Sequence, residues 1–159
     1  DKMQKEPMIY RDLIYLDPTY TSQHDLFESL FQQLYEKGFV QASFLQAIEE
    51  REGKYPTALP TEPFPIAIPH TDPEHIIKPF VAVIRLRDKL LWKQMVSEEV
   101  IAVKAVFLLG FHHHSEYHIR LLQKLMDLFS GTDFPDQLLK AENVEECYRL
   151  ACAEIGNLE

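Results

Sequence analysis

The chain has 159 residues, of which 46% are hydrophobic and 26% charged, a composition that fits one soluble globular domain with a buried core. Its formal net charge of −9 argues against the basic surface that nucleic-acid binders need, so no nucleic-acid partner is expected. The same charge suits plain solubility, and it also suits a basic protein partner because complementary fields speed encounter.

Alternating and helical patterns divide the first part of the chain into a strand, two helices and a loop. Residues 9–16 predict a short strand that ends at Asp17. Ser22 is the expected N-cap of a helix that ends before Gly38, with Asp25 near the positive end of its dipole. A second helix is expected over 43–52, and the four prolines of 55–65 exclude a helix or a central strand there.

The rest of the chain predicts further strands followed by helices. A short apolar strand over 66–68 ends at Pro69 and His70, and a helical turn is expected within 73–77. Runs rich in β-branched residues predict buried strands over 80–86 and 100–109. Helices are expected over 115–129, 135–140 and 144–155, with Ser115 and Asn143 as N-caps of the first and last. The order predicts an α/β fold, a mixed β-sheet flanked by helices, as a single compact domain over 1–159.

Cysteine content and hydropathy indicate a cytoplasmic protein. Cys147 and Cys152 are too few for a disulfide framework, and both are expected to pack in a helix rather than react. The first residues are polar and show no secretory signal. The longest apolar run, over 100–110, contains Lys104 and is too short to span a bilayer, so no direct membrane insertion is expected.

Histidine is the residue type of this sequence that is most suited to a catalytic role. The chain has seven histidines, but no Gly-rich phosphate loop, HExxH, paired CxxC or GxSxG motif. His70 follows an apolar strand and Pro69, so its backbone is constrained at a strand end, where ligand and catalytic groups of α/β sheets gather. The alternative for such a residue is a histidine that only hydrogen-bonds across a turn.

Three other residues have the chemistry to assist at a phosphate. His118 is expected in the first turn of the helix over 115–129, where the helix dipole disfavours its protonation and favours a nearby phosphate. Arg51 closes the second helix and offers a planar fork of donors that matches phosphate. Thr57, in the proline-rich loop, is a candidate hydrogen-bond donor to a phosphate oxygen. Taken alone, each of these three residues is more often an ordinary surface or loop residue than a phosphate ligand.

Four pieces of the sequence, in this order, resemble a known family. They are Ala47–Glu52 (AIEERE), Tyr55–Pro56–Thr57 with Leu59, Ile66–Thr71 (IAIPHT), and His118 followed by Leu121, Leu122 and Leu125. Together they are similar to the EIIA component of the bacterial sugar phosphotransferase system, in the fructose/mannitol superfamily. Thr71 stands where the mannitol branch has Gly, and Phe64 stands where that branch has an acidic residue. The Tyr–Pro–Thr loop and the His–Thr pair are more similar to the galactitol-type branch.

The resemblance implies a phosphotransferase that acts through a phosphohistidine intermediate. His70 would accept a phosphoryl group from the phosphocarrier protein HPr and pass it to a cysteine of EIIB, which is coupled to uptake of a galactitol-like sugar. It also implies a mixed sheet flanked by helices, with His118 and Arg51 flanking the phosphorylated histidine. Phosphoryl transfer needs mainly positioning and charge stabilisation, so no metal and no cofactor is implied.

Three other functions compete with a transport phosphocarrier. One is a regulatory EIIA-like domain that is phosphorylated on His70 but serves no sugar transporter. Another is a metal-dependent hydrolase that would use His70, His75 and the run His112–His114, although their spacing matches no strong zinc signature. The third is a binding module without catalysis.

Overall fold

The computed structural model describes residues 8–112 and 116–156. Its five strands are β1 (Ile9–Leu16), β2 (Ala58–Leu59), β3 (Ile66–Ala67), β4 (Phe80–Lys93) and β5 (Val100–Gly110). Its five α-helices, counted over these described residues, are α1 (Gln23–Glu36), α2 (Phe44–Lys54), α3 (Glu116–Leu128), α4 (Phe134–Lys140) and α5 (Val144–Glu154). A single 3₁₀ turn, η1 (Pro73–His75), lies between β3 and β4.

The strands form one mixed sheet in the order β1-β4-β5-β3-β2. β1 runs parallel to β4 and β3 runs parallel to β5, whereas β4 and β5 form a long antiparallel pair. Because β3 and β5 are parallel, their carboxyl ends meet at the same edge of the sheet. The predicted α/β fold, a mixed sheet flanked by helices in a single compact domain, is confirmed.

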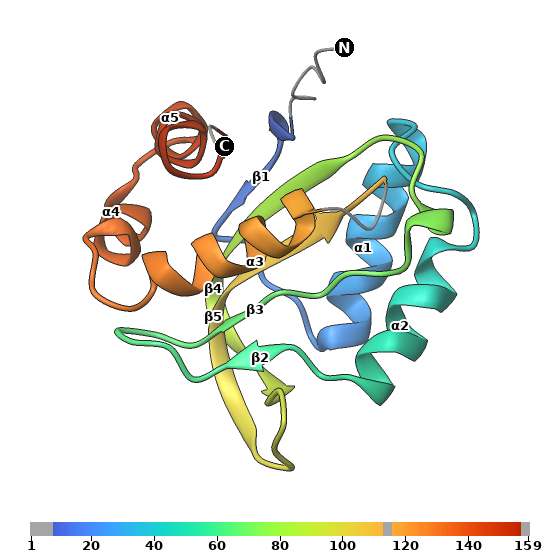
Figure 1. Ribbon diagram of the computed structural model, residues 1–159, viewed down its shortest axis with the longest axis horizontal. Coiled ribbons are helices and arrows are strands. Elements are labelled where there is room, and N and C mark those ends of the chain that lie inside the picture. Colours follow the sequence, from blue (N-terminus) through green and yellow to red (C-terminus); the bar gives the residue numbers. More distant parts are fainter. Residues whose placement is uncertain (1–7, 113–115, 157–159) are drawn as a thin grey trace.

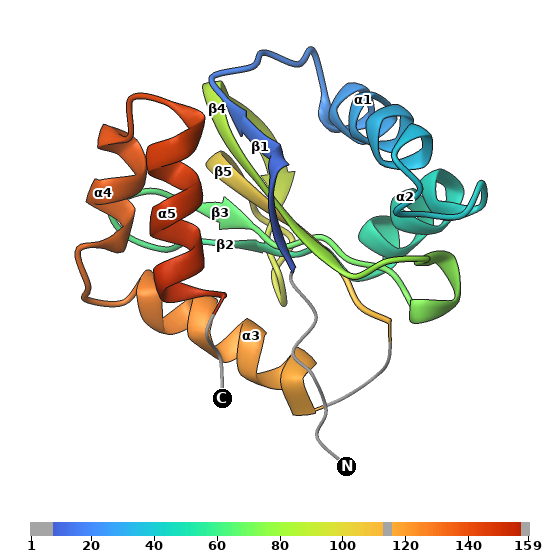
Figure 2. The same cartoon turned by 90° about the horizontal axis from the view of Figure 1, so that it is seen from above.

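Helices cover both faces of this sheet (Figures 1 and 2). α1 and α2 lie on one face, and α3, α4 and α5 lie on the other. Alternate residues of β4 serve the two cores: Val81 and Val83 pack with the α3–α5 side, while Ala82 and Ile84 pack with the α1–α2 side. A strand buried on both faces explains why the run at 80–86 is continuously apolar.

Two predicted helix caps are confirmed. The Ser22 hydroxyl accepts a hydrogen bond from the Asp25 backbone N–H at 3.1 Å, and Asn143 accepts one from the Glu146 N–H at 2.9 Å. The predicted cap at Ser115 lies outside the described residues. β4 continues to Lys93, well past the predicted end at residue 86, because a register irregularity between Arg85 and Leu90 lets the strand resume with Leu90 and Trp92 buried.

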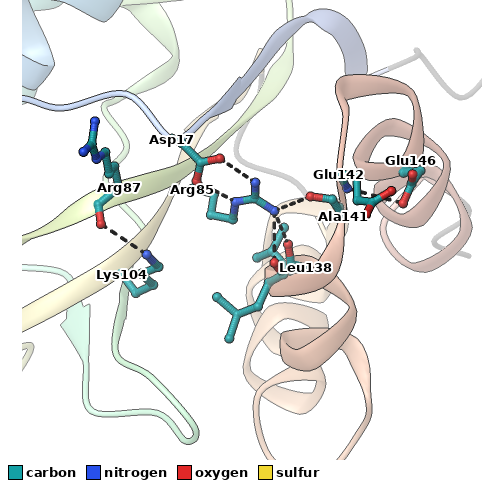
Figure 3. Close-up of polar contacts among 9 residues, drawn as sticks. Asp17, Arg85, Arg87, Lys104, Leu138, Ala141, Glu142 and Glu146 are labelled. Atoms are coloured by element: carbon teal, nitrogen blue, oxygen red, sulfur yellow. Dashed lines mark hydrogen bonds and ion pairs between the residues drawn. The ribbon is translucent and has the colours of Figure 1, made fainter.

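A buried arginine ties the C-terminal helices to the sheet (Figure 3). The guanidinium of Arg85, in β4, donates to both carboxylate oxygens of Asp17, at 3.0 and 2.7 Å. It also donates to the backbone carbonyls of Leu138 and Ala141, at 2.9 and 2.6 Å, where α4 ends. A cation at this place satisfies carbonyls that have no partner inside the helix and opposes the negative end of its dipole.

Asp17→Asn is expected to lower the free energy of unfolding by less than about 1 kcal/mol, since the Asp17 side chain is 51% exposed and solvent screens the pair. The hydrogen bond from Arg85 holds the pKa of Asp17 below its ordinary value of 3.8. The stabilisation is therefore complete above that ordinary value and is lost as pH falls through the lowered pKa. Urea unfolding near neutrality and in acid should show a difference between variant and parent only near neutrality, whereas Asp12→Asn, exposed on the preceding strand β1, should show none at either pH.

Candidate functional site

His70 lies at the carboxyl end of β3, beside the end of β5. It forms an isolated parallel bridge with Leu109, and the Leu109 N–H donates to the Pro69 carbonyl at 3.0 Å. The backbone that carries His70 is thus fixed by a strand partner on one side and by the Pro69 ring before it. The His70 residue is only partly buried, so part of it remains accessible to solvent.

The hydrogen bond of the His70 ring determines which nitrogen can act as a nucleophile. His70 Nδ1 lies 2.9 Å from the Ile68 carbonyl oxygen. A carbonyl only accepts, so Nδ1 must carry the proton in this contact. In the neutral imidazole the lone pair is then on Nε2, which makes Nε2 the nitrogen able to attack phosphorus.

His118 lies next to His70, as expected from the sequence. It is the third residue of α3, and its ring centroid is 5.5 Å from that of His70, with the two ring planes at 85°. α3 begins at Glu116 in the described part of the chain, so the amino end of this helix, with the partial positive charge of its dipole, is at the site. The two imidazoles and a helix end therefore converge on the carboxyl edge of β3 and β5.

Arg51 approaches the same segment from the other face of the sheet. It lies in the last turn of α2, and its Nη1 is 3.4 Å from Asp72 Oδ1, two residues after His70. Its guanidinium also lies 5.3 Å from the centre of the Tyr55 ring. Arg51 and Asp72 line a pocket of about 230 Å³ together with Thr71 and His75. The structure thus places Arg51 beside the chain that follows His70, held by a long and half-exposed ion pair.

Thr57 has a different environment from the other three candidates. It is 4% exposed, and its hydroxyl and backbone N–H both bond the carboxylate of Glu52, at 3.0 and 2.7 Å. The indole N–H of Trp92 donates to the same carboxylate at 2.7 Å. The single hydroxyl proton of Thr57 is therefore directed at Glu52 in this structure, and the group joins the end of α2 to β2 and β4.

The family model for the EIIA 2 component of the phosphoenolpyruvate-dependent sugar phosphotransferase system matches residues 8–151. The chain belongs to this EIIA family. The resemblance seen in the sequence is confirmed, and the chain is a phosphotransferase of the kind that acts through a phosphohistidine intermediate. A binding module without catalysis is thereby set aside.

Known proteins resemble this EIIA chain at low identity. The galactitol-specific EIIA component of Escherichia coli K12 is 23% identical over 121 residues, which are 76% of this chain and 80% of that protein. Enzyme IIA for mannitol from E. coli, solved in a complex with phosphorylated enzyme IIB, has a TM-score of 0.70 at 19% identity, covering 89% of this chain and 95% of that one. The nitrogen regulatory protein IIA-Ntr of Neisseria meningitidis has a TM-score of 0.74 at 23% identity, covering 90% and 95%.

Two further groups of this EIIA chain with reactive chemistry, His75 and Cys147, are hydrogen-bonded or buried. His75 Nδ1 lies 2.7 Å from the Ser43 hydroxyl, and burial raises the pKa of the Cys147 thiol to about 11. Within residues 8–112 and 116–156, no group of three His, Cys, Asp or Glu side chains is placed to hold a metal ion. His113 and His114 of the suggested hydrolase set lie outside that range.

No helix in the described part of the chain has the length and apolar character to cross a membrane.

Two residues near the site were not singled out from the sequence. Glu52 is 4% exposed and receives the hydrogen bonds from Thr57 and Trp92. Phe111 is 3% exposed, and its ring stacks on His118 with centroids 3.7 Å apart. Glu52 belongs to the AIEERE piece, so the sequence could have indicated it as a site residue. Phe111 is an apolar residue after a strand, and nothing in the sequence distinguishes it from other core residues.

Glu52→Gln is expected to destabilise the EIIA fold by about 1–2 kcal/mol, because charge-assisted hydrogen bonds become neutral ones. The backbone N–H of Thr57 and the Trp92 indole both donate to Oε2, and a glutamine oxygen at that place can keep them. The glutamine N–H₂ group then faces the Thr57 hydroxyl, which has to turn from donor to acceptor. Burial is the largest influence on Glu52 and raises its pKa, while the bonds from Trp92 and Thr57 lower it.

Urea unfolding and fluorescence measure this effect, because Trp92 is the only tryptophan in the sequence. The emission maximum of Trp92 in the folded Glu52→Gln protein should shift, and the free energy of unfolding should fall. Glu50→Gln is the matched control, since Glu50 is exposed on the same helix and accepts a hydrogen bond from the Gln46 side chain. Equal stability of both variants would show that the carboxylate is not needed.

Proposed function

We propose that His70 is the residue of this EIIA protein that carries the phosphoryl group. The observation that carries the proposal is the bond from His70 Nδ1 to the Ile68 carbonyl, which directs the Nε2 lone pair to the reaction. The position of His70 at a strand end, next to His118 and the amino end of α3, supports it.

In the proposed cycle, the Nε2 lone pair of His70 attacks the phosphorus of the phosphohistidine of HPr. An N–P bond to His70 forms as the N–P bond to HPr breaks, and HPr recovers its neutral imidazole. A cysteine thiolate of EIIB then attacks the same phosphorus, and the His70 N–P bond breaks to return the lone pair to Nε2. With Nδ1 protonated, the phosphorylated ring carries positive charge, which the Ile68 carbonyl stabilises.

His118 and Arg51 are proposed to stabilise the phosphoryl group in transit. His118 donates a ring N–H to a phosphate oxygen, and the amino end of α3 adds its partial positive charge. Arg51 is held by one oxygen of Asp72 at 3.4 Å, a weak contact that a doubly charged phosphate outcompetes. Thr57 is proposed to act indirectly: by fixing Glu52 it holds the end of α2, and with it the backbone of Arg51.

The sugar branch and the partners form the finer part of the proposal. Similarity to the galactitol-specific EIIA component favours a galactitol-like sugar, and the complex solved for mannitol enzyme IIA favours EIIB as the acceptor. A cytoplasmic location follows from a phosphoryl chain that begins at phosphoenolpyruvate. A regulatory EIIA that is phosphorylated on His70 and serves no transporter remains the alternative function.

A two-step relay tests the proposal. Incubation with phosphoenolpyruvate, Enzyme I and HPr should raise the intact mass of the protein by one phosphoryl group, located on His70 by fragmentation. Addition of a galactitol EIIB should then remove that group and place it on the EIIB cysteine. Labelling without onward transfer to any sugar EIIB would favour the regulatory alternative, and labelling of another residue would contradict the assignment of His70.

A further inference from the structure

One aromatic ring contacts both imidazoles of the site. Phe111 directly follows the last residue of β5, and its ring is nearly parallel to that of His118, with an angle of 17° and centroids 3.7 Å apart. The same ring meets His70 edge to face, with an angle of 77° and centroids 6.2 Å apart. His118 in turn stands at 85° to His70, so the three rings form one contiguous cluster.

The position of Phe111 is fixed by the strand before it and by the core around it. Phe111 is 3% exposed and belongs to the core between the sheet and α3–α5. A Cβ on Gly110 would lie 2.2 Å from the ring of Phe80, which is fully buried. The end of β5 therefore lies directly against a rigid aromatic side chain, and Phe111 leaves the strand from a backbone with little freedom.

We infer that Phe111 is a positioning residue that sets the ring plane of His118 beside His70. His118 belongs to the first turn of α3, and helix ends have more freedom than helix interiors. A face-to-face contact leaves the His118 ring free to slide in its plane but opposes its tilting, so the edges that carry N–H stay directed alongside His70. The inference rests on the proposed role of His118 in phosphoryl transfer.

The competing account is that Phe111 only fills the core. If Phe111 only fills the core, its substitution lowers stability and changes the phosphoryl-transfer rate by the same factor with or without the His118 imidazole. A positioning residue acts through His118, so its effect must vanish when the imidazole is removed. The two accounts therefore differ in a double-mutant cycle and in the environment of the His118 ring.

The first measurement needs no phosphoryl donor. In the unphosphorylated protein the ring protons of His118 should resonate upfield because they lie over the face of Phe111; His118→Ala assigns them by their loss. Phe111→Leu should remove the upfield shift and Phe111→Tyr should retain it. Phe134→Leu, in the same core but packed against Phe107 and Phe129, should leave the shift unchanged. An unchanged His118 spectrum in Phe111→Leu would overturn the inference.

The second measurement is rapid-quench transfer from HPr to the same variants. Phe111→Leu should slow transfer by about twofold to tenfold, the factor expected from one aromatic pair. Phe111→Tyr should restore most of the rate, and Phe111→Leu should add almost nothing to His118→Ala. An equal loss in both backgrounds would overturn the positioning role. His118→Ala could transfer at the parent rate while the ring-proton shift responds to Phe111 as expected. That result would contradict the proposed role of His118 in transfer but would confirm that Phe111 positions its ring.

Discussion

His70→Ala is expected to reduce phosphoryl transfer from HPr by more than about a thousandfold, since the variant loses the nucleophile on which the covalent step depends. The fold should survive, because His70 is only partly buried and the hydrogen bond from its ring to the Ile68 carbonyl is worth about 1 kcal/mol. Intact mass after incubation with the relay, together with a urea unfolding curve, measures both parts of this prediction.

His70→Gln makes the test stricter. Its amide N–H₂ can still donate to the Ile68 carbonyl, but it has no lone pair able to attack phosphorus, so it should be as inactive as alanine. His24→Ala is the matched control, because His24 is an exposed histidine of α1 that pairs with Glu49. Phosphorylation of His70→Gln at the parent rate, or its loss in His24→Ala, would contradict the assignment.

Helix and strand types were predictable because the local pattern and the tertiary environment agree. The apolar spacing of α1 and the run of β-branched residues in β5 each suit one element, and Ser22 and Asn143 cap helices as their side chains dictate. The full length of β4 was not predictable, since Arg87 to Lys89 are exposed at a register irregularity and resemble the end of a strand. β2 has only two residues and exists through its pairing with β3.

The sequence could name the residues of the candidate site, but it could not give the distances and orientations between them. A constrained histidine after a strand, and a histidine in a first helical turn, are local features that indicate function only in combination. Their contact depends on the parallel pairing of β3 with β5, which sets His70 beside Leu109 and brings Phe111 against the ring of His118. The buried environment of Thr57 was not predictable from the sequence. It depends on the tertiary fold, which brings Trp92 to the same Glu52 carboxylate that Thr57 bonds.

The sugar branch of the proposed relay is determined outside the phosphorylation site. In the proposed relay the phosphoryl group passes from His70 to another protein, so the chemistry at His70 is the same whichever sugar is imported. Selectivity then lies in the surface that meets EIIB rather than in the imidazoles. Transfer rates to different EIIB proteins therefore report the branch more directly than any variant of the imidazoles.

His118→Ala is expected to slow transfer through His70 by about tenfold to a hundredfold in both directions, while still allowing His70 to be labelled. A hydrogen bond to a charged phosphate is worth about 1.5–3 kcal/mol, and the loss falls on the rate if the bond is made fully only in the transition state. His118→Gln should recover part of the rate, because its amide can donate to a phosphate oxygen in place of the imidazole. Rapid-quench transfer from HPr to each variant, and onward to EIIB, measures the effect.

The matched control for His118 is Gln123→Ala, exposed on the same helix, which should transfer at the parent rate. The location of the phosphoryl group completes the test, since a residue that only stabilises the group must never carry it. The ring centroids of His70 and His118 are 5.5 Å apart, so one phosphoryl group bound to His70 is within reach of a donor on His118. Transfer by His118→Ala at the parent rate in both directions, or phosphate found on His118 itself, would refute this role.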